Sequence, residues 1–276
     1  MTQPGVSRQV KQLEQALGFA LIDRDQRPVA MTPAGSEFLS SAEAILKEIE
    51  SAIQRMSAGS TPAGSIVVAA SSIPGEFLVP GILARFSAIY PRVRPSLITT
   101  DSAGVAEALL ARRAEIGFLG AKVVEQRLRL IPFSEDEIVL VVPAVHPLAD
   151  KPSVVLADLA SQTFVERSEG SGTLGSLKRI LSEHGMHLPE HSVAMIAGTS
   201  QVQLAAIEAG VGLGFVSSLA LANRSQLRVK GMSLEGMKIR RTLYLAHENA
   251  PLSLAAQTLV DFICEQKDEH GSTTIR

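Results

Sequence analysis

The chain opens with the stretch Thr2-Gln3-Pro4-Gly5-Val6-Ser7-Arg8-Gln9-Val10-Lys11-Gln12-Leu13-Glu14, which predicts an amphipathic helix. Its apolar residues recur at offsets of four, three and four and share one face: Val6, Val10, Leu13 and Leu17. Thr2 suits the N-cap, Pro4 the first turn and Gly18 the position after the last turn. The other face carries polar and basic side chains of the kind that contact DNA bases and phosphates, although any surface helix has the same periodicity.

The residues after this helix narrow the interpretation. Leu21-Ile22-Asp23-Arg24 runs into Gln26-Arg27-Pro28-Val29-Ala30-Met31-Thr32-Pro33-Ala34-Gly35, and a long helix follows. This order resembles the LysR-type transcriptional regulators, whose signature is approximately Ser-Gln-Pro-Ala-Val-Ser-Arg-Gln-Ile, then Leu-Phe-x-Arg, then Leu-Thr-x-Ala-Gly. The chain matches it at Gln3, Pro4, Val6, Ser7, Arg8, Gln9, Leu21, Arg24, Thr32, Ala34 and Gly35. It departs at Thr2, Gly5, Ile22 and Met31. Glycine inside a helix costs about 1 kcal/mol relative to alanine, so Gly5 is the departure with the largest expected effect.

The resemblance implies that double-stranded DNA is a partner. It assigns to the groove Gln3, Pro4, Ser7, Arg8 and Lys11, and to the wing and the phosphates Arg24 and Arg27. In the family, two further helices precede the recognition helix, whereas here Met1 stands directly before it. We expect an in-frame extension upstream that encodes those helices. The alternative is a shortened product with impaired DNA binding.

Composition bounds the class of protein. A length of 276 residues predicts two domains, and 46% hydrophobic with 20% charged residues is typical of a soluble globular protein. A net charge of −2 gives no chain-wide attraction to nucleic acid. The single cysteine, Cys264, excludes an internal disulfide and fits a reducing compartment. Without an N-terminal signal pattern or an apolar run of about 18 residues, the sequence predicts a cytoplasmic protein with no membrane partner.

Residues 34 to 57 are predicted to form a linker helix. Its apolar face comprises Phe38, Leu39, Ala42, Ile45, Leu46, Ile49, Ile53 and Met56. In the resembled family this helix pairs with a second copy, which implies a homodimer or homotetramer. The alternative is that this apolar face packs on its own domain. The small residues of Ser57-Ala58-Gly59-Ser60-Thr61-Pro62-Ala63-Gly64 then predict a domain boundary.

Beyond the boundary, strands and helices alternate. We expect strands at 66–70, 94–100, 115–119, 138–142, 163–166, 193–196, 212–216 and 238–246. We expect helices at 74–90 (bent at Pro80), 105–112, 174–184, 202–209 and 253–266. This rhythm predicts an open parallel sheet with helices on both faces.

Several phrases in this part resemble the periplasmic-binding-protein-like effector domain of the same family. They are Leu78-Val79-Pro80 with Leu83, Phe86 and Pro91, Val141-Val142-Pro143 before His146-Pro147-Leu148-Ala149, and Ile207-Glu208-Ala209-Gly210-Val211-Gly212. The expected fold is therefore α/β: a partial winged helix-turn-helix at 1–33, a linker helix at 34–57, and a two-subdomain effector domain at 64–276. Subdomain I would comprise 64–143 and 236–276, and subdomain II 144–235.

Ligands of open α/β sheets bind beyond the carboxyl ends of strands, where helices begin. Small polar residues and one arginine occupy these places here. The predicted effector-binding residues are Ser71, Ser72, Thr100, Ser102, Arg167, Ser171, Thr173, Thr199 and Ser200. Free backbone N–H groups, hydroxyls and an arginine suit a small anion or carboxylate, a co-inducer in the resembled family. Each residue alone is equally consistent with a turn or a cap, and Asp101 and Glu169 argue against a multiply charged anion unless they point away.

Catalytic and metal-binding patterns are weak. The loop Gly170-Ser171-Gly172-Thr173 lacks the lysine of a P-loop, and no Gly-x-Ser-x-Gly motif occurs. His184, His187 and His191 have helical spacing, but Gly185 and Pro189 would break that helix. We therefore expect no enzyme, no metal and no cofactor. The sequence predicts a LysR-type regulator that responds to a small effector; the alternative is a cytosolic small-molecule-binding protein that has lost DNA binding.

Overall fold

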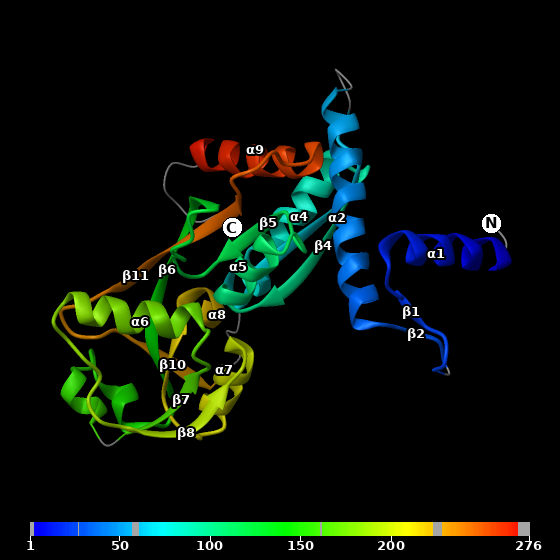
Figure 1. The fold of residues 1–276 in the computed structure, drawn as a ribbon. Coiled ribbons are helices and arrows are strands. Elements are labelled where there is room, and N and C mark those ends of the chain that lie inside the picture. The colour runs from blue at the N-terminus through cyan, green and yellow to red at the C-terminus, as the bar shows by residue number, and fades with distance from the viewer. Residues whose placement is uncertain (1–2, 27, 57–60, 161, 223–227, 270–276) are drawn as a thin grey trace. The chain divides into compact units, whose positions relative to one another are not determined.

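The chain forms two compact units, Met1–Ser60 and Thr61–Arg276 (Figure 1). The structure, a computed structural model, describes residues 3–26, 28–56, 61–160, 162–222 and 228–269. Among these residues, no helix is both long and apolar enough to cross a membrane.

The first unit is helix, two-stranded wing and helix, as the sequence predicts. It comprises α1 (Gln3–Leu17), β1 (Ile22–Asp23), β2 (Ala30–Met31) and α2 (Pro33–Met56). β1 and β2 pair antiparallel. Gly18 ends α1 with a φ of +80°, a conformation that favours glycine. The expected N-cap, Thr2, lies outside the described residues.

Glu14 joins α1 to the wing. Its carboxylate accepts the backbone N–H groups of Leu21 and Ile22 at 2.9 and 3.1 Å and pairs with Arg24 at 2.9 Å. These two backbone hydrogen bonds, followed by the positive charges of Arg24 and Lys11, hold the pKa of Glu14 below its ordinary value. The wing is therefore fixed to the carboxyl end of α1 by a charged acceptor.

Two apolar surfaces of this unit are uncovered in the described chain. On α1, Val6 is 45% and Leu13 39% exposed. On α2, the exposed residues of the apolar face are Leu39, Ile45, Leu46, Ile49 and Ile53. Apolar faces of this length are stable when another element covers them.

The second unit is built around one mixed sheet. Its strands are β3 (Gly64–Ser71), β4 (Val93–Thr100), β5 (Ile116–Leu119), β6 (Leu128–Pro143), β7 (Thr163–Arg167), β8 (Ser192–Ala197), β9 (Gly214–Ser217), β10 (Val229–Met232) and β11 (Ile239–Glu248). The large sheet has the order β10-β6-β11-β5-β3-β4, with β9 also on β6, and β7 pairs with β8. Its helices are α3 (Ser72–Phe77), α4 (Val79–Ile89), α5 (Ser102–Leu110), α6 (Gly172–Glu183), α7 (Ser200–Glu208), α8 (Ser218–Ala222) and α9 (Leu254–Glu269).

The prediction of an open parallel sheet is wrong for four of the seven strands of the large sheet, β6, β9, β10 and β11, whose pairings are antiparallel. β3 pairs parallel with β4 and β5, but β11 runs antiparallel to both β5 and β6. The cause is that β6 and β11 are long strands that carry the chain away from β3 and back. We call β3, β4 and β5 with α4, α5 and α9 the β3 end, and β7 to β10 with α6, α7 and α8 the β7 end (Figure 1).

Other expectations also need correction. The single bent helix at 74–90 is two helices, α3 and α4, separated at Leu78; Pro80 stands in the first turn of α4, where its missing N–H costs nothing. β6 begins at Leu128, ten residues before the predicted strand. α8, β10 and two 3₁₀ turns, Pro147–Asp150 and Leu156–Leu159, were not predicted from the sequence.

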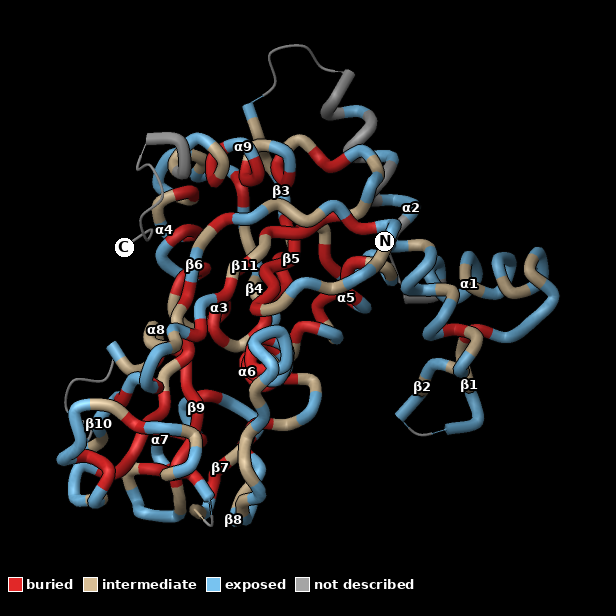
Figure 2. Tube along the Cα trace, turned by 90° about the vertical axis from the view of Figure 1, so that its left-hand side faces the viewer, coloured by how far each residue is buried: buried red, intermediate tan, exposed pale blue. Residues whose placement is uncertain are grey.

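Each end has its own apolar core, visible as the buried segments in Figure 2. At the β3 end, strand residues Ile66 and Val68 pack with Phe86 of α4 and with Leu259 and Ile263 of α9. At the β7 end, the cluster includes Phe164, Leu177, Leu181 and Phe215. Because α9 contributes to the core of the β3 end, the last part of the described chain completes the same end of the unit in which β3 lies.

A buried ion pair joins the two long strands. Asp136 of β6 and Arg241 of β11 are register partners, each 4% exposed. The guanidinium Nε donates to Asp136 Oδ2 at 2.8 Å, and Nη2 lies 2.7 Å from the same oxygen but outside hydrogen-bonding geometry. Asp136 Oδ1 accepts the Ser217 hydroxyl at 2.7 Å, while Arg241 Nη1 donates to the Gly120 carbonyl at 3.0 Å. The pair therefore connects both ends of the unit.

We expect Glu14→Gln to loosen the junction of α1 and the wing, because a neutral amide oxygen is a weaker acceptor than a carboxylate. Amide-proton exchange at Leu21 and Ile22, measured by NMR, should accelerate at neutral pH. Since the pKa of Glu14 is lowered in the fold, its stabilisation is present at neutral pH and is lost as the pH falls through that pKa. Wild type and variant should therefore converge in acid. Glu37→Gln on α2 is the control; equal exchange at neutral pH would refute this role.

We expect Asp136→Ala to lower the free energy of unfolding by about 3–5 kcal/mol, since it leaves the Arg241 charge buried and unpaired. The double change Asp136→Leu with Arg241→Met should recover much of this loss. The matched control is Glu137→Ala, because Glu137 and Arg240 form the next register pair at 4.0 Å with a half-buried glutamate and an exposed arginine. Surface pairs of this kind contribute about 0–1 kcal/mol. Urea unfolding curves that place both single variants together would contradict the prediction.

Candidate effector site and DNA-facing helix

The predicted effector residues lie where the β3 end meets the β7 end. Four helices begin there: α3 directly after β3, α5 after β4, α6 after the loop that follows β7, and α7 after β8. Their amino ends carry unpaired backbone N–H groups and the positive end of the helix dipole. We call this region the seam.

Arg167, the last residue of β7, crosses the seam. Its side chain is 4% exposed. Nη1 donates to the Ser200 hydroxyl of α7 at 2.8 Å, and Nη2 donates to the Ser72 hydroxyl of α3 at 3.2 Å. Nε and Nη2 also donate to the Ala197 and Gly198 carbonyls. Arg167 thus brings three of the predicted residues together, one from each of β7, α3 and α7.

The charge of Arg167 is poorly compensated. Each hydrogen bond recorded for its guanidinium ends on a neutral hydroxyl or carbonyl oxygen. Burial lowers the pKa of Arg167 from its ordinary value; the nearby Glu76 charge opposes this shift and the Arg241 charge adds to it. A buried cation with neutral partners favours an additional anion beside it.

Ser71 connects the seam to the buried ion pair. Its hydroxyl accepts the Gly120 N–H at 2.8 Å, and the Gly120 carbonyl accepts Arg241. Gly120 also lies against α6: a Cβ added to Gly172 would be 3.0 Å from the Gly120 carbonyl carbon. The positions of α3 and α6 therefore depend on the same loop after β5.

α5 and α6 approach each other closely through glycines. A Cβ at Gly172 would lie 2.7 Å from the Ser102 hydroxyl, and one at Gly170 would lie 2.0 Å from Asp101 Oδ2. Ser102 is 5% exposed, and its hydroxyl has no hydrogen-bond partner among the described residues. A buried unpartnered hydroxyl costs free energy unless something binds it.

The other predicted residues have local roles in the structure. Ser171 and Thr199 are the N-caps of α6 and α7, accepting the N–H groups of Leu174 and Val202. Thr173 is buried in the first turn of α6. Thr100 is exposed at the end of β4 and lies against Gly104 of the following helix. Among the described residues, neither threonine at 100 or 199 has a recorded hydrogen bond across the seam.

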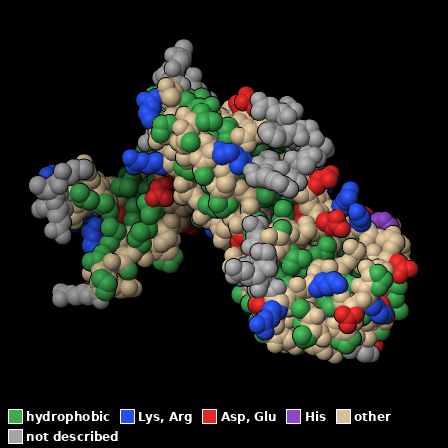
Figure 3. All heavy atoms as spheres, turned by 180° about the vertical axis from the view of Figure 1, so that it is seen from behind, with side chains coloured by type: hydrophobic (Ala, Val, Ile, Leu, Met, Phe, Trp, Pro, Cys, Tyr) green, Lys and Arg blue, Asp and Glu red, His purple; other side chains and the backbone are tan. Residues whose placement is uncertain are grey.

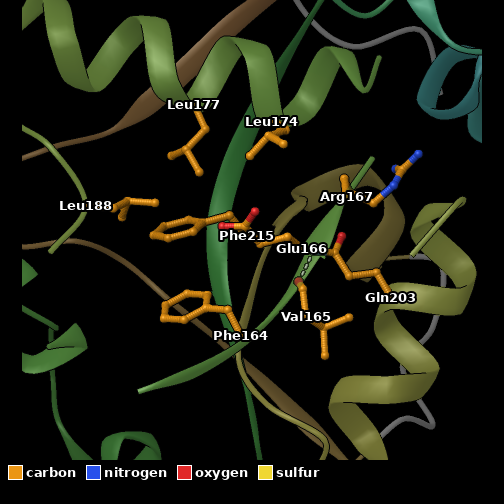
Figure 4. A pocket seen from close by; sticks show the side chains of 9 residues that line it. All are labelled: Phe164, Val165, Glu166, Arg167, Leu174, Leu177, Leu188, Gln203 and Phe215. Atoms are coloured by element: carbon orange, nitrogen blue, oxygen red, sulfur yellow. Dashed lines mark hydrogen bonds between the residues drawn. The ribbon is translucent and has the colours of Figure 1, made fainter. Parts of the chain in front are cut away.

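A small cavity lies beside the seam, between β7, β9 and α6 (Figure 4). It is lined by Phe164, Val165, Glu166, Arg167, Leu174, Leu177, Leu188, Gln203 and Phe215. Its volume of about 20 Å³ holds roughly one water molecule. In Figure 4 the Arg167 guanidinium points away from the two phenylalanine rings. This cavity is therefore part of the packing of the β7 end and too small for an effector.

The DNA-facing residues assigned from the resemblance lie on α1 and the wing. Ser7, Arg8 and Lys11 are exposed on α1, whereas Arg24 pairs with Glu14. Gln3 and Pro4 belong to α1, but their side chains lie outside the described residues, as does Arg27. On the face of Thr61–Arg276 seen in Figure 3, basic and acidic side chains are interspersed. The exposed basic residues of α1, Arg8 and Lys11, are the clearest candidates for phosphate contacts.

Sequence reasoning missed several residues of the seam. Asp136 fell in a stretch with no predicted element. Arg241 lay inside a predicted strand, on the same face as the apolar Ile239 and Leu243, and a charge on an apolar strand face is the signal that could have marked it. The close approach of Gly170 to Asp101 joins two distant segments and leaves no local pattern. Among the described residues, no group of three or more His, Cys, Asp or Glu side chains is arranged to hold a metal ion.

Comparison with known proteins agrees with this architecture. Residues 1–36 match the model of the bacterial regulatory helix-turn-helix protein of the lysR family, and residues 59–268 match the LysR substrate binding domain. The RuBisCO operon transcriptional regulator of Allochromatium vinosum is 30% identical over 96% of this chain and 88% of its own length.

Two solved structures share the fold. The effector binding domain of QuiR in complex with shikimate has a TM-score of 0.67 at 20% identity, covering 76% of this chain and 99% of that one. Full-length CbnR complexed with its target DNA has a TM-score of 0.69 at 20% identity, covering 96% and 90%. The helix–wing–helix unit, the substrate-binding unit and a 30% identical regulator all agree, and the chain belongs to the LysR family of transcriptional regulators.

Proposed function

We propose that this LysR-type regulator binds a small anionic effector at the seam. The observation that carries the proposal is Arg167, a buried guanidinium whose recorded hydrogen bonds all end on neutral oxygens. An effector carboxylate would place a negative charge in direct contact with the guanidinium and accept charge-assisted hydrogen bonds. The hydroxyls of Ser72 and Ser200 already contact Arg167, so they are the first candidates to contact the same anion.

The wider effector set is part of the same proposal. Ser71, Ser102, Ser171 and Thr173 lie around the helix amino ends, where backbone N–H groups suit an anion. Thr100 and Thr199 would define the exposed edge. The bound domain of QuiR holds shikimate, which makes a hydroxylated carboxylate a rational first probe for this chain. We propose subdomain boundaries at 64–143 with 236–276, and 144–235, so that β6 and β11 link the two parts around the seam.

The proposed DNA surface is the polar face of α1 with the wing. Ser7, Arg8 and Lys11 would enter the groove together with Gln3 and Pro4, and Arg24 and Arg27 would contact phosphates. A protein that only binds small molecules is not favoured, because residues 1–36 match the family's helix-turn-helix model. Such a regulator acts where the chromosome lies, so we propose the cytoplasm as its location.

We propose that a second copy covers the exposed apolar face of α2, giving a homodimer or a homotetramer. Ile45, Leu46 and Ile53 are 61, 61 and 59% exposed, values expected for the face of a pairing helix rather than for a finished surface. An effector that favours one arrangement of the β3 and β7 ends would then alter the spacing of paired recognition helices on DNA.

The effector proposal predicts that anion-dependent stabilisation requires Arg167. We expect Arg167→Met to abolish the thermal stabilisation produced by shikimate and other small carboxylates, and Arg167→Lys to retain part of it. Losing a charge-assisted hydrogen bond costs about 1.5–3 kcal/mol, or roughly a tenfold to hundredfold loss of affinity. The control is Arg179→Met on α6, whose arginine is exposed and pairs with Glu183. Carboxylate stabilisation that survives Arg167→Met would refute the site.

The DNA proposal predicts that Arg8→Ala and Lys11→Ala each weaken binding to duplex from upstream of the gene. Each should also reduce the slope of log affinity against log salt by about 1, because one phosphate contact is lost. Fluorescence anisotropy at several salt concentrations measures both quantities. Arg113→Ala, which removes an exposed arginine of the second unit, is the control. Unchanged slopes for both α1 variants would contradict the assigned surface.

A further inference from the structure

The amino ends of α5 and α6 face each other across the seam. α5 begins at Ser102 and α6 at Gly172, and these two residues are in direct proximity. Both helices are long enough, at 9 and 12 residues, for their dipoles to act at this point. The buried Ser102 hydroxyl, without a partner among the described residues, is directed at the first residue of α6. Two helix dipoles and an unpartnered donor thus converge on one place.

A carboxylate of the chain itself already stands there. Asp101 is the N-cap of α5, and its Oδ1 accepts the Gly104 N–H at 2.7 Å. Its Oδ2 lies over the α-carbon of Gly170, two residues before α6. A Cβ at residue 170 would lie only 2.0 Å from this oxygen, so the approach requires glycine. Asp101 therefore does not point away from the seam, and its negative charge faces the amino end of α6.

The backbone positions that carry the positive group and face the negative group of the seam lie close together in the chain. Arg167 precedes Gly170 by three residues, which span at most about 10 Å even when fully extended. Arg167 bonds to Ser72 and Ser200 at one side, while Asp101 and Ser102 meet Gly170 and Gly172 at the other. A ligand lying between these groups would meet a cation at one end and a carboxylate with a hydroxyl at the other.

We infer that Asp101 selects the charge of the effector. The effector carries a single anionic group, held toward Arg167, and a hydroxyl or ammonium donor at its other end that faces Asp101 and Ser102. A second anionic group would lie beside the Asp101 carboxylate and be repelled, whereas a hydrogen-bond donor would be accepted. This inference rests on the proposed effector site and adds the class of ligand: a monoanion with a donor, such as a hydroxy acid or an amino acid.

Asp101→Asn tests the charge selection without removing the helix cap, because asparagine retains the Oδ1 acceptor and caps equally well. Sulfate, a compact dianion, is the first probe, titrated by calorimetry at constant ionic strength. We expect Asp101→Asn to bind sulfate roughly tenfold more tightly than wild type, as expected for removal of a nearby like charge. Glu107→Gln, which removes an exposed carboxylate from the same helix, should bind like wild type.

The double variant Asp101→Asn with Arg167→Met separates this inference from the proposed function. A gain in sulfate affinity that disappears in the double variant supports both. No gain in Asp101→Asn overturns the charge selection; the effector site still stands if Arg167→Met lowers carboxylate binding, and falls if it does not. A gain that persists in the double variant would mean that sulfate binds without Arg167, which also overturns the inference.

Lactate and propionate test the donor end, because they differ by one hydroxyl. We expect the wild-type chain to bind lactate more tightly than propionate, and Asp101→Asn with Ser102→Ala to remove the difference. Equal or undetectable binding of both acids to wild type would overturn the donor assignment, with the charge selection then decided by the sulfate titration. A preference for lactate that survives both changes would equally exclude Asp101 and Ser102 as its cause.

Discussion

The buried pair of Asp136 and Arg241 is the interaction on which the second unit depends. It joins β6 to β11, the strands that carry the chain between the two ends, and each partner makes further bonds beyond the pair. Through Gly120, Arg241 reaches Ser71 and the start of α3; through Ser217, Asp136 reaches β9. Burial of two charges costs several kcal/mol each unless the geometry satisfies them, so an arrangement of these strands that left either partner unpaired would be unstable. Because Gly120 and Ser71 lie at the seam, the geometry of the seam depends on this ion pair.

The seam itself combines rigidity with an incomplete charge balance. Arg241 has a carboxylate partner, whereas the recorded bonds of Arg167 end on hydroxyls and carbonyls. The two arginines are both buried and close enough for each charge to affect the other. Arg241 serves the fold, and Arg167 is the arginine that we propose binds an anion. Glycines at 170 and 172 let the opposing helix ends approach until side-chain oxygens of α5 lie against the loop before α6.

Local patterns predicted much of this structure. Periodicity predicted α1 and α2, which are determined by short-range sequence and by Gly18, while the order of the residues between them and the family resemblance predicted the wing. The mixed sheet was not predictable in the same way, since β11 pairs with β6 through residues 105 positions apart. For the site, strand-end polarity identified Arg167, Ser72 and Ser200, which the structure connects. It could not show that Thr199 caps α7, or that Asp101 faces Gly170, because both depend on side-chain direction.

The return of the chain to its starting end has a consequence for synthesis. The described residues of the first unit have all been translated once residue 60 has been made, and domains fold as they emerge from the ribosome. The core around Ile66 and Val68 waits for Leu259 and Ile263, and Asp136 waits for Arg241. Nearly the whole chain must therefore be translated before the core of the second unit can form. During synthesis, the DNA-facing helix α1 is therefore present long before the second unit can fold and bind a ligand.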